Sequence, residues 1–267
     1  MDGSSRSGTV VSRRDAGARG DGRIEGSSAV VRGTYARAGA SPAAALAACV
    51  LALFCASAPA AELWVGAAST DITPDRPVAL DGHRNLRVSD KIESRITATA
   101  LAIESREGDR ALECAIIVSC DIVAIRDGIR DTVREKVGPR LPGFEARKLI
   151  LCATHTHNAP VTVEGKYTLP EGGIMRPSEY AEFMTERVAD AIVSAWEGRK
   201  RGRVGWGQGQ AVVAKNRRAV YADGTAKMYG ATSGDDFRGI EGYEDHDMDA
   251  LFFWDEGGRL IATAINV

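Results

Sequence analysis

Several motifs that mark well-known classes of protein are missing from this sequence. It contains no P-loop, no dinucleotide-binding fingerprint and no G-x-S-x-G nucleophile motif. No internal repeat with a period of about 20–50 residues is visible, which argues against a solenoid or a propeller. The net charge is only −2 over 267 residues, so overall charge does not predict a nucleic-acid partner.

The N-terminal residues have the pattern of a leader. Residues 1–40 are rich in Gly, Ser, Ala and Arg and lack an apolar period, so we expect them to be disordered. An apolar segment follows at residues 43–56, and Ala58-Pro59-Ala60 fits a signal-peptidase site. We interpret residues 1–61 as a basic leader plus signal peptide, which predicts an exported protein, periplasmic or secreted. A membrane anchor is the alternative, although the apolar segment is shorter than the roughly 20 residues that span a bilayer.

Cysteine is scarce after the leader. Three of the five cysteines remain there, namely Cys114, Cys120 and Cys152. An odd number in an exported protein argues against a disulfide framework. Each of the three lies in an apolar run, so we expect small, buried hydrophobic residues.

Residues 62–267 predict one α/β domain. A strand pattern opens it at Glu62, and residues 96–104 and 111–120 form two further strands joined by a tight turn, which predicts a hairpin. A long amphipathic helix is predicted from an N-cap at Ser178 to Gly198. We expect the cations of residues 199–203 to complement the dipole of that helix.

A βαβ unit lies at the centre of this prediction. Apolar residues recur at every fourth position from Ile125 to Val137, which predicts a second amphipathic helix. It separates the strand at 111–120 from one at 148–155, so these strands are expected to be parallel. Parallel strands place their carboxyl ends at one sheet edge, where sites of α/β proteins gather. Asp121 and His155 are therefore expected at that edge.

The last third of the sequence predicts β structure. Residues 203–213 form a glycine-rich strand, Asp223-Gly224 marks one hairpin, and residues 255–258 mark the turn of another. With the helices, these strands predict a mixed β-sheet with flanking helices, an incomplete layered sandwich. Val267 lies inside an apolar strand pattern without a turn or cap, so we expect the chain to be the front part of a larger domain.

Two of the four histidines lie in the stretch ATHTHNAP, residues 153–160. On an extended backbone, an H-x-H pair directs both imidazoles to the same side, because strand side chains alternate. Imidazole is a good zinc ligand, and catalytic zinc keeps one coordination position for water. The alternative is two histidines that bind backbone groups at a strand end. The expected position at the sheet edge favours the metal site.

Several motifs, in this order, resemble the N-terminal catalytic domain of the neutral/alkaline non-lysosomal ceramidase family. They are VGAASTDITPD (65–75), ALDG (79–82), SCD (119–121), ATHTHNAP (153–160) and KNRRAVY (215–221). The resemblance covers roughly residues 63–267. It implies a secreted or membrane-associated zinc amidase that cleaves the N-acyl bond of ceramide, giving sphingosine and a fatty acid.

The resemblance also implies roles for three residues. His155 matches the first zinc ligand of the family, His157 matches the neighbouring histidine that assists the substrate or its oxyanion, and Arg217 matches an arginine of the active site. A surface cation is the alternative for Arg217. This chain has Asn158-Ala159-Pro160 where family members usually have Ser-Gly-Pro, which leaves ceramide itself open as the substrate. The second zinc-binding histidine and the later Ser, Glu and Tyr of the family are expected beyond Val267.

Other candidates are weaker. Asp245, His246 and Asp247 are possible ligands by type, but in a strand they alternate faces, so we expect a structural role. His83 is a candidate to line the site. Asp121 either orients a histidine or caps the following helix. Three functions stay open at this point: a ceramidase-type zinc hydrolase, an exported hydrolase of another amide or ester, and a non-catalytic binding domain.

Overall fold

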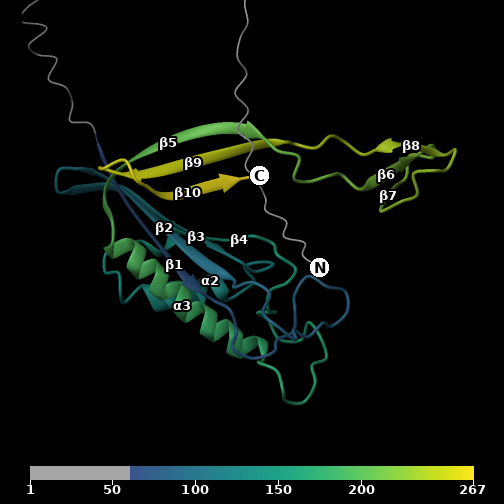
Figure 1. Cartoon of the computed structure of the whole chain (residues 1–267), viewed down its shortest axis with the longest axis horizontal. Helices are drawn as coiled ribbons and strands as arrows, with labels where there is room; N and C mark the ends of the chain where they lie inside the picture. Colours follow the sequence, from purple (N-terminus) through teal and green to yellow (C-terminus); the bar gives the residue numbers. More distant parts are fainter. Residues whose placement is uncertain (1–60) are drawn as a thin grey trace, which may run out of the picture. The chain divides into compact units, whose positions relative to one another are not determined.

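The computed structural model describes residues 61–267 (Figure 1). The predicted leader and signal peptide fall on residues outside this range. The export that they predict therefore stays a prediction. Within residues 61–267, no helix combines the length and the apolar character needed to cross a membrane.

A seven-stranded mixed sheet forms the body of the domain, which confirms the α/β prediction. Its order is β10-β9-β5-β1-β2-β3-β4, and β3 and β4 are the parallel neighbours, while the other pairs are antiparallel. The strands are β1 (Glu62–Asp71), β2 (Thr97–Glu107), β3 (Arg110–Cys120), β4 (Leu149–Ala153), β5 (Lys200–Gln210), β9 (Asp247–Asp255) and β10 (Leu260–Asn266).

Two helices cover one face of strands β1 to β4, as Figure 1 shows. They are α2 (Ile129–Val137) and α3 (Pro177–Glu197), and a short 3-10 helix, η1 (Ala146–Lys148), precedes β4. Both helices bury the apolar stripe that their sequence predicts, for example Val133 of α2 and Val188 of α3. The facing side chains of the sheet are small or β-branched, such as Ala100 and Val118, so the helices pack closely on it.

A helix approaches the sheet closely at Gly66 in β1. A β-carbon at this position would lie 2.0 Å from the carbonyl oxygen of Ala195 in α3. No side chain fits at that separation, so a glycine at position 66 sets the distance between α3 and the sheet.

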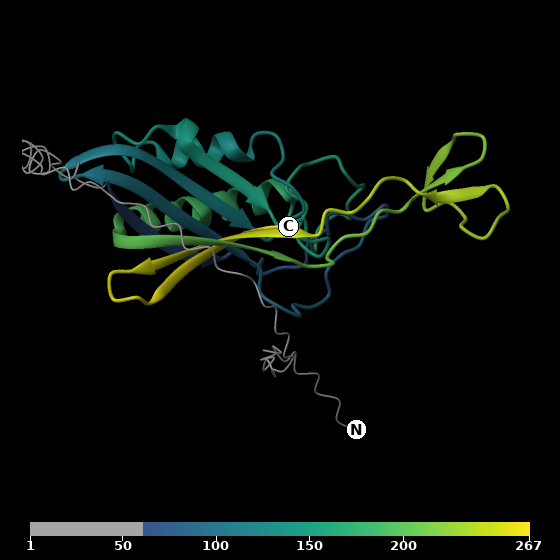
Figure 2. The ribbon, with the colours of Figure 1, turned by 90° about the horizontal axis from the view of Figure 1, so that it is seen from above.

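A second, smaller core lies on the opposite face of the sheet. Phe253 of β9 packs there against Val65 and Leu101, with residues of β10 around it. On the neighbouring pair of β5 and β9, Trp206 and Leu251, which lie opposite each other, are exposed. The β9-β10 hairpin lies at one edge of the sheet, and Figure 2 shows it from above.

The chain between β5 and β9 forms a separate three-stranded sheet. Its strands are β6 (Arg218–Tyr221), β7 (Ala226–Met228) and β8 (Phe237–Ile240), in the order β7-β6-β8. The sheet lies beyond the ends of β5 and β9 (Figures 1 and 2). The hairpin at Asp223-Gly224 is confirmed, whereas β8 was not predicted, because its four residues have no alternating apolar pattern.

Several boundaries differ from the sequence prediction. Helix α2 begins at Ile129, one turn later than the apolar period suggests. Ser178 is not the N-cap of α3; Arg176 holds that position, and the carboxylate of Glu179 accepts a hydrogen bond from the backbone N–H of Arg176. Of the cations after α3, Arg199 binds a helix carbonyl, that of Trp196, while residues 200–203 belong to β5.

Candidate active site

Three loops leave the sheet at the same edge. Strand β1 runs antiparallel to β2, and β2 runs antiparallel to β3, so β1, β3 and β4 point the same way. The segments 72–96, 121–128 and 154–176 therefore all begin at the carboxyl ends of these strands, the edge where α/β sites gather. The sequence predicted two of these loops at the edge, and the structure adds the one after β1.

His155 follows β4 and is oriented by the loop after β3. Its backbone N–H donates to the carbonyl of Ile122 at 3.0 Å, and its Nδ1 lies 2.7 Å from the carbonyl oxygen of Val123. Because a carbonyl only accepts, Nδ1 is the donor, and in the neutral ring Nε2 is then the nitrogen with the lone pair. Metal-binding histidines are typically held by this kind of bond.

His157 brings its imidazole to the same point. The Nε2 atoms of His155 and His157 are 3.3 Å apart, and their ring centroids are 4.9 Å apart. The predicted reason was wrong, because β4 ends at Ala153 and His155 has a φ of +62°, which is not extended backbone. A left-handed residue, rare outside glycine, turns the chain here and produces the convergence.

The spacing of the two Nε2 atoms matches that of two ligands on one metal ion. Two nitrogen ligands about 2.0–2.1 Å from one tetrahedral zinc ion are about 3.3–3.4 Å apart. The pair His155 and His157 therefore fits a shared ion geometrically. Residues 61–267 contain no group of three or more His, Cys, Asp or Glu side chains placed to hold a metal, so the pair accounts for part of a coordination sphere.

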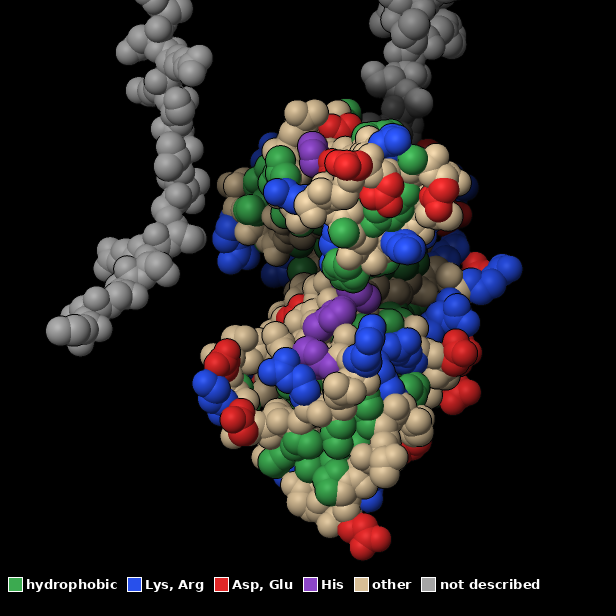
Figure 3. All heavy atoms as spheres, turned by 90° about the vertical axis from the view of Figure 1, so that its right-hand side faces the viewer, with side chains coloured by type: hydrophobic (Ala, Val, Ile, Leu, Met, Phe, Trp, Pro, Cys, Tyr) green, Lys and Arg blue, Asp and Glu red, His purple; other side chains and the backbone are tan. Residues whose placement is uncertain are grey.

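Gly82 and His83, from the loop after β1, lie next to His157. A β-carbon on Gly82 would lie 2.4 Å from Cγ of His157, so the peptide at Gly82 packs directly on that imidazole. The ring of His83 lies edge-on to His157, with centroids 6.2 Å apart. Its Nε2 is buried and has no hydrogen-bond partner among the described residues. Figure 3 shows histidine side chains in a continuous row on this face.

Arg217 lies away from the histidine contacts described above. It immediately precedes β6, and its guanidinium donates a hydrogen bond to the Tyr229 hydroxyl at 2.7 Å and stacks over the ring. These contacts belong to the small sheet. The active-site role that the resemblance implies for Arg217 therefore stays a prediction.

Asp121 has neither of the two roles weighed for it. Its carboxylate accepts hydrogen bonds from the backbone and hydroxyl of Thr97 and from the hydroxyl of Thr154. It ties the ends of β2 and β4 together, and the helix α2 starts eight residues later without a side-chain cap.

The motif around His246 is structural in the part of the chain described, as expected. The carboxylate of Asp245 accepts from the backbone of Asp247, and Asp247 accepts from Gln210. These bonds close the end of the β5-β9 pair.

The cysteines differ from one another in exposure. All three are free thiols. Burial raises the pKa of Cys120, at the end of β3, to about 12, while Cys152 of β4 is exposed. The prediction of three buried residues holds only for Cys120. Cys114 is partly buried, and Cys152 is exposed because β4 is the edge strand and Cys152 lies on the face without helices.

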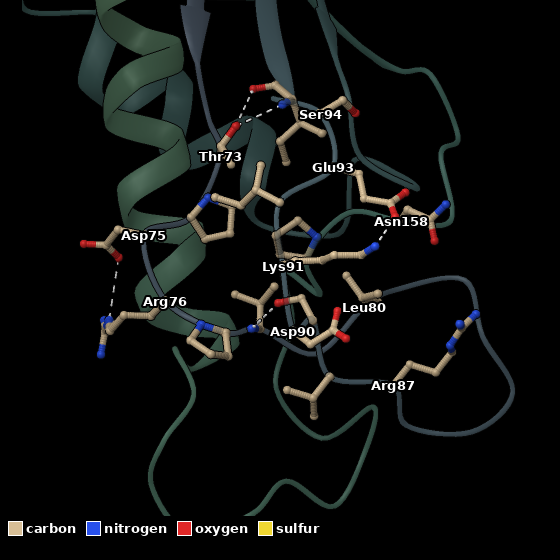
Figure 4. A pocket seen from close by; sticks show the side chains of 18 of the residues that line it. Thr73, Asp75, Arg76, Leu80, Arg87, Asp90, Lys91, Glu93, Ser94 and Asn158 are labelled. Atoms are coloured by element: carbon tan, nitrogen blue, oxygen red, sulfur yellow. Dashed lines mark hydrogen bonds and ion pairs between the residues drawn. The ribbon is translucent and has the colours of Figure 1, made fainter. Parts of the chain in front are cut away.

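A cavity of about 770 Å³ lies beside the histidines rather than at them. Figure 4 shows it between the segment 73–96 and the loop after β4, with Asn158 at one side. Thr156 and Asn158, which flank His157, contribute to its lining, whereas His155 and His157 do not. Charged side chains such as Arg87, Lys91 and Glu93 line it together with apolar ones.

Comparison with known proteins identifies the fold. No family model and no curated protein matches the sequence. The structure is similar to that of the neutral ceramidase from Pseudomonas aeruginosa, with a TM-score of 0.57 and 20% sequence identity over 77% of this chain. It is also similar to a ceramidase complexed with C2, with a TM-score of 0.56 and 19% identity. The chain spans 31% of the length of each of these proteins. Its fold is therefore that of part of a neutral ceramidase, the family that the ordered motifs resemble.

Proposed function

We propose that this chain is part of a zinc-dependent amidohydrolase that cleaves the N-acyl amide bond of ceramide-like sphingolipids. The observation that carries the proposal is the imidazole pair at the carboxyl edge of a ceramidase-like sheet, with Nε2 of His155 and Nε2 of His157 3.3 Å apart. The bond from Nδ1 of His155 to Val123 leaves the lone pair of Nε2 available for a metal ion.

The two histidines have different roles in this proposal. His155 holds the metal through Nε2. Zinc, when bound, lowers the pKa of a water molecule to about 7 and polarises a carbonyl group. His157 lies within hydrogen-bond reach of the same point, where its Nε2 can donate to a developing oxyanion. The packing of Gly82 on its ring holds His157 in place for that bond.

The proposal extends to partners and location. A ceramide-like lipid is the substrate, and the membrane surface is where the protein would meet it. Arg217 would reach the bound lipid from the small sheet. Export through the leader of residues 1–61 is part of this proposal.

Asn158 favours a second candidate function, the hydrolysis of a different amide or ester. Family members usually carry Ser-Gly-Pro after the histidine pair, whereas this chain carries Asn158-Ala159-Pro160. Asn158 lines the charged cavity next to the site. A polar amide at this position would bind a substrate with more hydrogen-bonding groups than ceramide.

Metal binding by the full chain tests the proposal most directly. We expect cobalt, as a zinc substitute with a visible spectrum, to bind weakly, since His155 is the one ligand that the proposal assigns among the described residues. His155→Ala should lower the affinity at least tenfold, while His246→Ala, a histidine of the β8-β9 segment, should leave it unchanged. Equal affinities for His155→Ala and the unmodified chain would refute the proposed ligand.

Hydrolysis separates the candidates. Release of fatty acid from ceramide, compared with simpler N-acyl amides and esters, ranks the substrates. Preference for ceramide supports the first candidate, and preference for another amide or ester supports the second. The third possibility, a binding domain, needs a version extended to the length of the ceramidases. If that version binds cobalt through His155 but hydrolyses none of these substrates, the protein is a binding domain.

A further inference from the structure

A buried carboxylate lies behind the imidazole pair. The side chain of Asp81 is 3% exposed and is paired with two cations, Arg126 and Lys166. Nη2 of Arg126 donates to one carboxylate oxygen at 3.2 Å, and the other oxygen accepts from Nζ of Lys166 and from the backbone N–H of Gly82. Moving a charged carboxylate out of water costs solvation free energy, so a buried carboxylate needs well-placed partners.

The partners of Asp81 come from the three loops that form the site. Gly82 is the next residue and packs on the ring of His157. Arg126 belongs to the loop after β3, three residues beyond the Val123 carbonyl that orients His155. The backbone N–H of Asp81 also donates to the carbonyl of Ala159, two residues beyond His157.

Asp81 thus forms hydrogen bonds to both segments that contact the imidazoles. One segment is the Gly82 peptide under His157, and the other is the 121–128 loop with the acceptor of His155. Among residues 61–267, the hydrogen-bond partners of the Asp81 carboxylate are Gly82, Arg126 and Lys166, and neither histidine bonds to it. Loss of the carboxylate would free Arg126 and Gly82 to move independently, and the spacing between the two Nε2 atoms would no longer be set.

We propose that Asp81 is a positioning residue that fixes the relative orientation of His155 and His157 through Arg126 and Gly82. This inference deepens the proposed function and rests on it for the use that the pair has. It names a residue that was singled out by neither charge nor spacing in the sequence. The contacts that support it are those among Asp81, Arg126 and Gly82.

The domain offers a matched control. Glu104 in β2 is also a buried carboxylate with two arginine partners, Arg106 and Arg199. It lies seven residues along β2 from Thr97 at the site edge, about 23 Å at the rise of a strand. Glu104→Gln therefore removes the same kind of ion pair without touching the loops of the site.

The experiment compares Asp81→Asn and Glu104→Gln in the full chain by two readouts. The first is the nitrogen-15 NMR signals of the imidazoles without metal, which report the tautomer and surroundings of each ring. The second is the cobalt affinity. We expect Asp81→Asn to shift the signals of both His155 and His157 and to lower cobalt affinity tenfold or more, as loss of supporting residues behind a metal ligand does. Glu104→Gln should change neither readout.

Two results would overturn the inference. One is an Asp81→Asn protein with imidazole signals and cobalt affinity like those of the unmodified chain. The other is a Glu104→Gln protein that changes both readouts as much as Asp81→Asn does, because the effect would then be general destabilisation. If Asp81→Asn does not fold, Gly82→Ala serves instead, since it keeps the ion pairs but disturbs the peptide under His157, where a φ of +86° and the 2.4 Å approach to Cγ of His157 both oppose a β-carbon. It should shift the signal of His157 more than that of His155, and equal or absent shifts count against the proposal.

The metal-free NMR readout keeps this inference distinct from the proposed function. A chain that binds no cobalt refutes the metal site, but its imidazole signals still report whether Asp81 positions the pair.

Discussion

The carbonyl oxygen of Val123 and Nδ1 of His155 are 2.7 Å apart, and this one bond determines which nitrogen of His155 is available. Val123 lies 32 residues earlier in the chain, in the loop after β3. The two come together because β3 and β4 are parallel neighbours whose carboxyl ends meet. A tautomer at the candidate site is thus set by the topology of the sheet.

This bond predicts unequal roles for the two histidines. His155 has a preset lone pair on Nε2, whereas His157 has no such bond to a carbonyl among the hydrogen bonds of the described residues. We expect His155→Ala to weaken cobalt binding by at least tenfold, and more than His157→Ala does, in a spectroscopic titration. A larger loss for His157→Ala would reverse the assignment of ligand and neighbour.

Gly66 predicts a large effect on stability. Gly66→Ala places a β-carbon 2.0 Å from the carbonyl oxygen of Ala195, so α3 must move away from the sheet. We expect the free energy of unfolding to fall by about 1–3 kcal/mol or more, measured by urea denaturation. Gly207→Ala is the control, because its β-carbon would meet only Phe252 at 3.9 Å, an ordinary contact. A similar loss in both variants would mean that the contact with Ala195 is not what requires glycine.

The buried hydroxyl of Tyr180 predicts a second effect on stability. It donates a hydrogen bond to the carbonyl of Ile72 at 3.0 Å, and burial raises the pKa of the phenol well above its usual range. Tyr180→Phe leaves that buried carbonyl without this donor, so we expect a loss of about 1–3 kcal/mol in urea denaturation. Tyr243→Phe should have little effect, since Tyr243 is 86% exposed. Equal stability of the Tyr180→Phe and unmodified proteins would contradict the expected contribution of this bond.

The thiols predict a selective pattern of alkylation. Cys152 is exposed, whereas burial raises the pKa of Cys120 to about 12, so that thiol stays protonated at pH 8. We expect iodoacetamide to modify Cys152 at least ten times faster than Cys120, followed residue by residue by peptide mass spectrometry. In urea the two rates should become similar. Fast labelling of Cys120 in the folded protein would argue against its burial.

Asp71 predicts a loss of stability in acid. Hydrogen bonds from the side chain and then the backbone of Thr73, helped by Arg95, lower the pKa of this carboxyl. The unfolded chain then binds the proton more readily, so the stabilisation is present above the unfolded pKa of about 3.9 and disappears as pH falls through the folded pKa. We expect Asp71→Asn to reduce the dependence of the urea midpoint on pH below about 4.

The size of this acid effect is modest, because the side chain of Asp71 is 37% exposed and solvent screens its charge. Asp109→Asn, an exposed carboxylate in the turn between β2 and β3, provides the comparison. If both variants and the unmodified chain show the same slope between pH 2.5 and 4, the hydrogen bonds of Thr73 do not lower the pKa as described.

Much of the fold followed from local pattern. The hairpin of β2 and β3, the parallel pair of β3 and β4 and the two C-terminal hairpins are confirmed, because alternation, a four-residue apolar period and turn residues are local signals. Helix α2 was predicted to start too early for the same reason. The apolar period extends back to Ile125, but residues 121–128 are not helical. They form the loop with the Val123 carbonyl, which accepts the hydrogen bond from His155.

The candidate site was predicted only in part. The type and spacing of His155 and His157 are local features, and parallel strands placed them at a sheet edge. The approach of Gly82 to His157 was not predictable, because these residues are 75 positions apart and glycine has no side chain to signal a contact. Asp81 was missed because a single aspartate before a glycine is typical of any turn.

The sequence by itself determined the residue types at the site, the order of the strands and helices along the chain and the family that the motifs resemble. Those are properties of neighbouring residues and of their periodicity. Only the tertiary structure decided which loops meet at the carboxyl edge, which nitrogen of His155 is free and which buried carboxylate lies behind the pair. The physical reason is that burial and hydrogen bonding depend on contacts between residues such as Asp81 and Arg126, which lie far apart in sequence and become neighbours only when β1, β3 and β4 align.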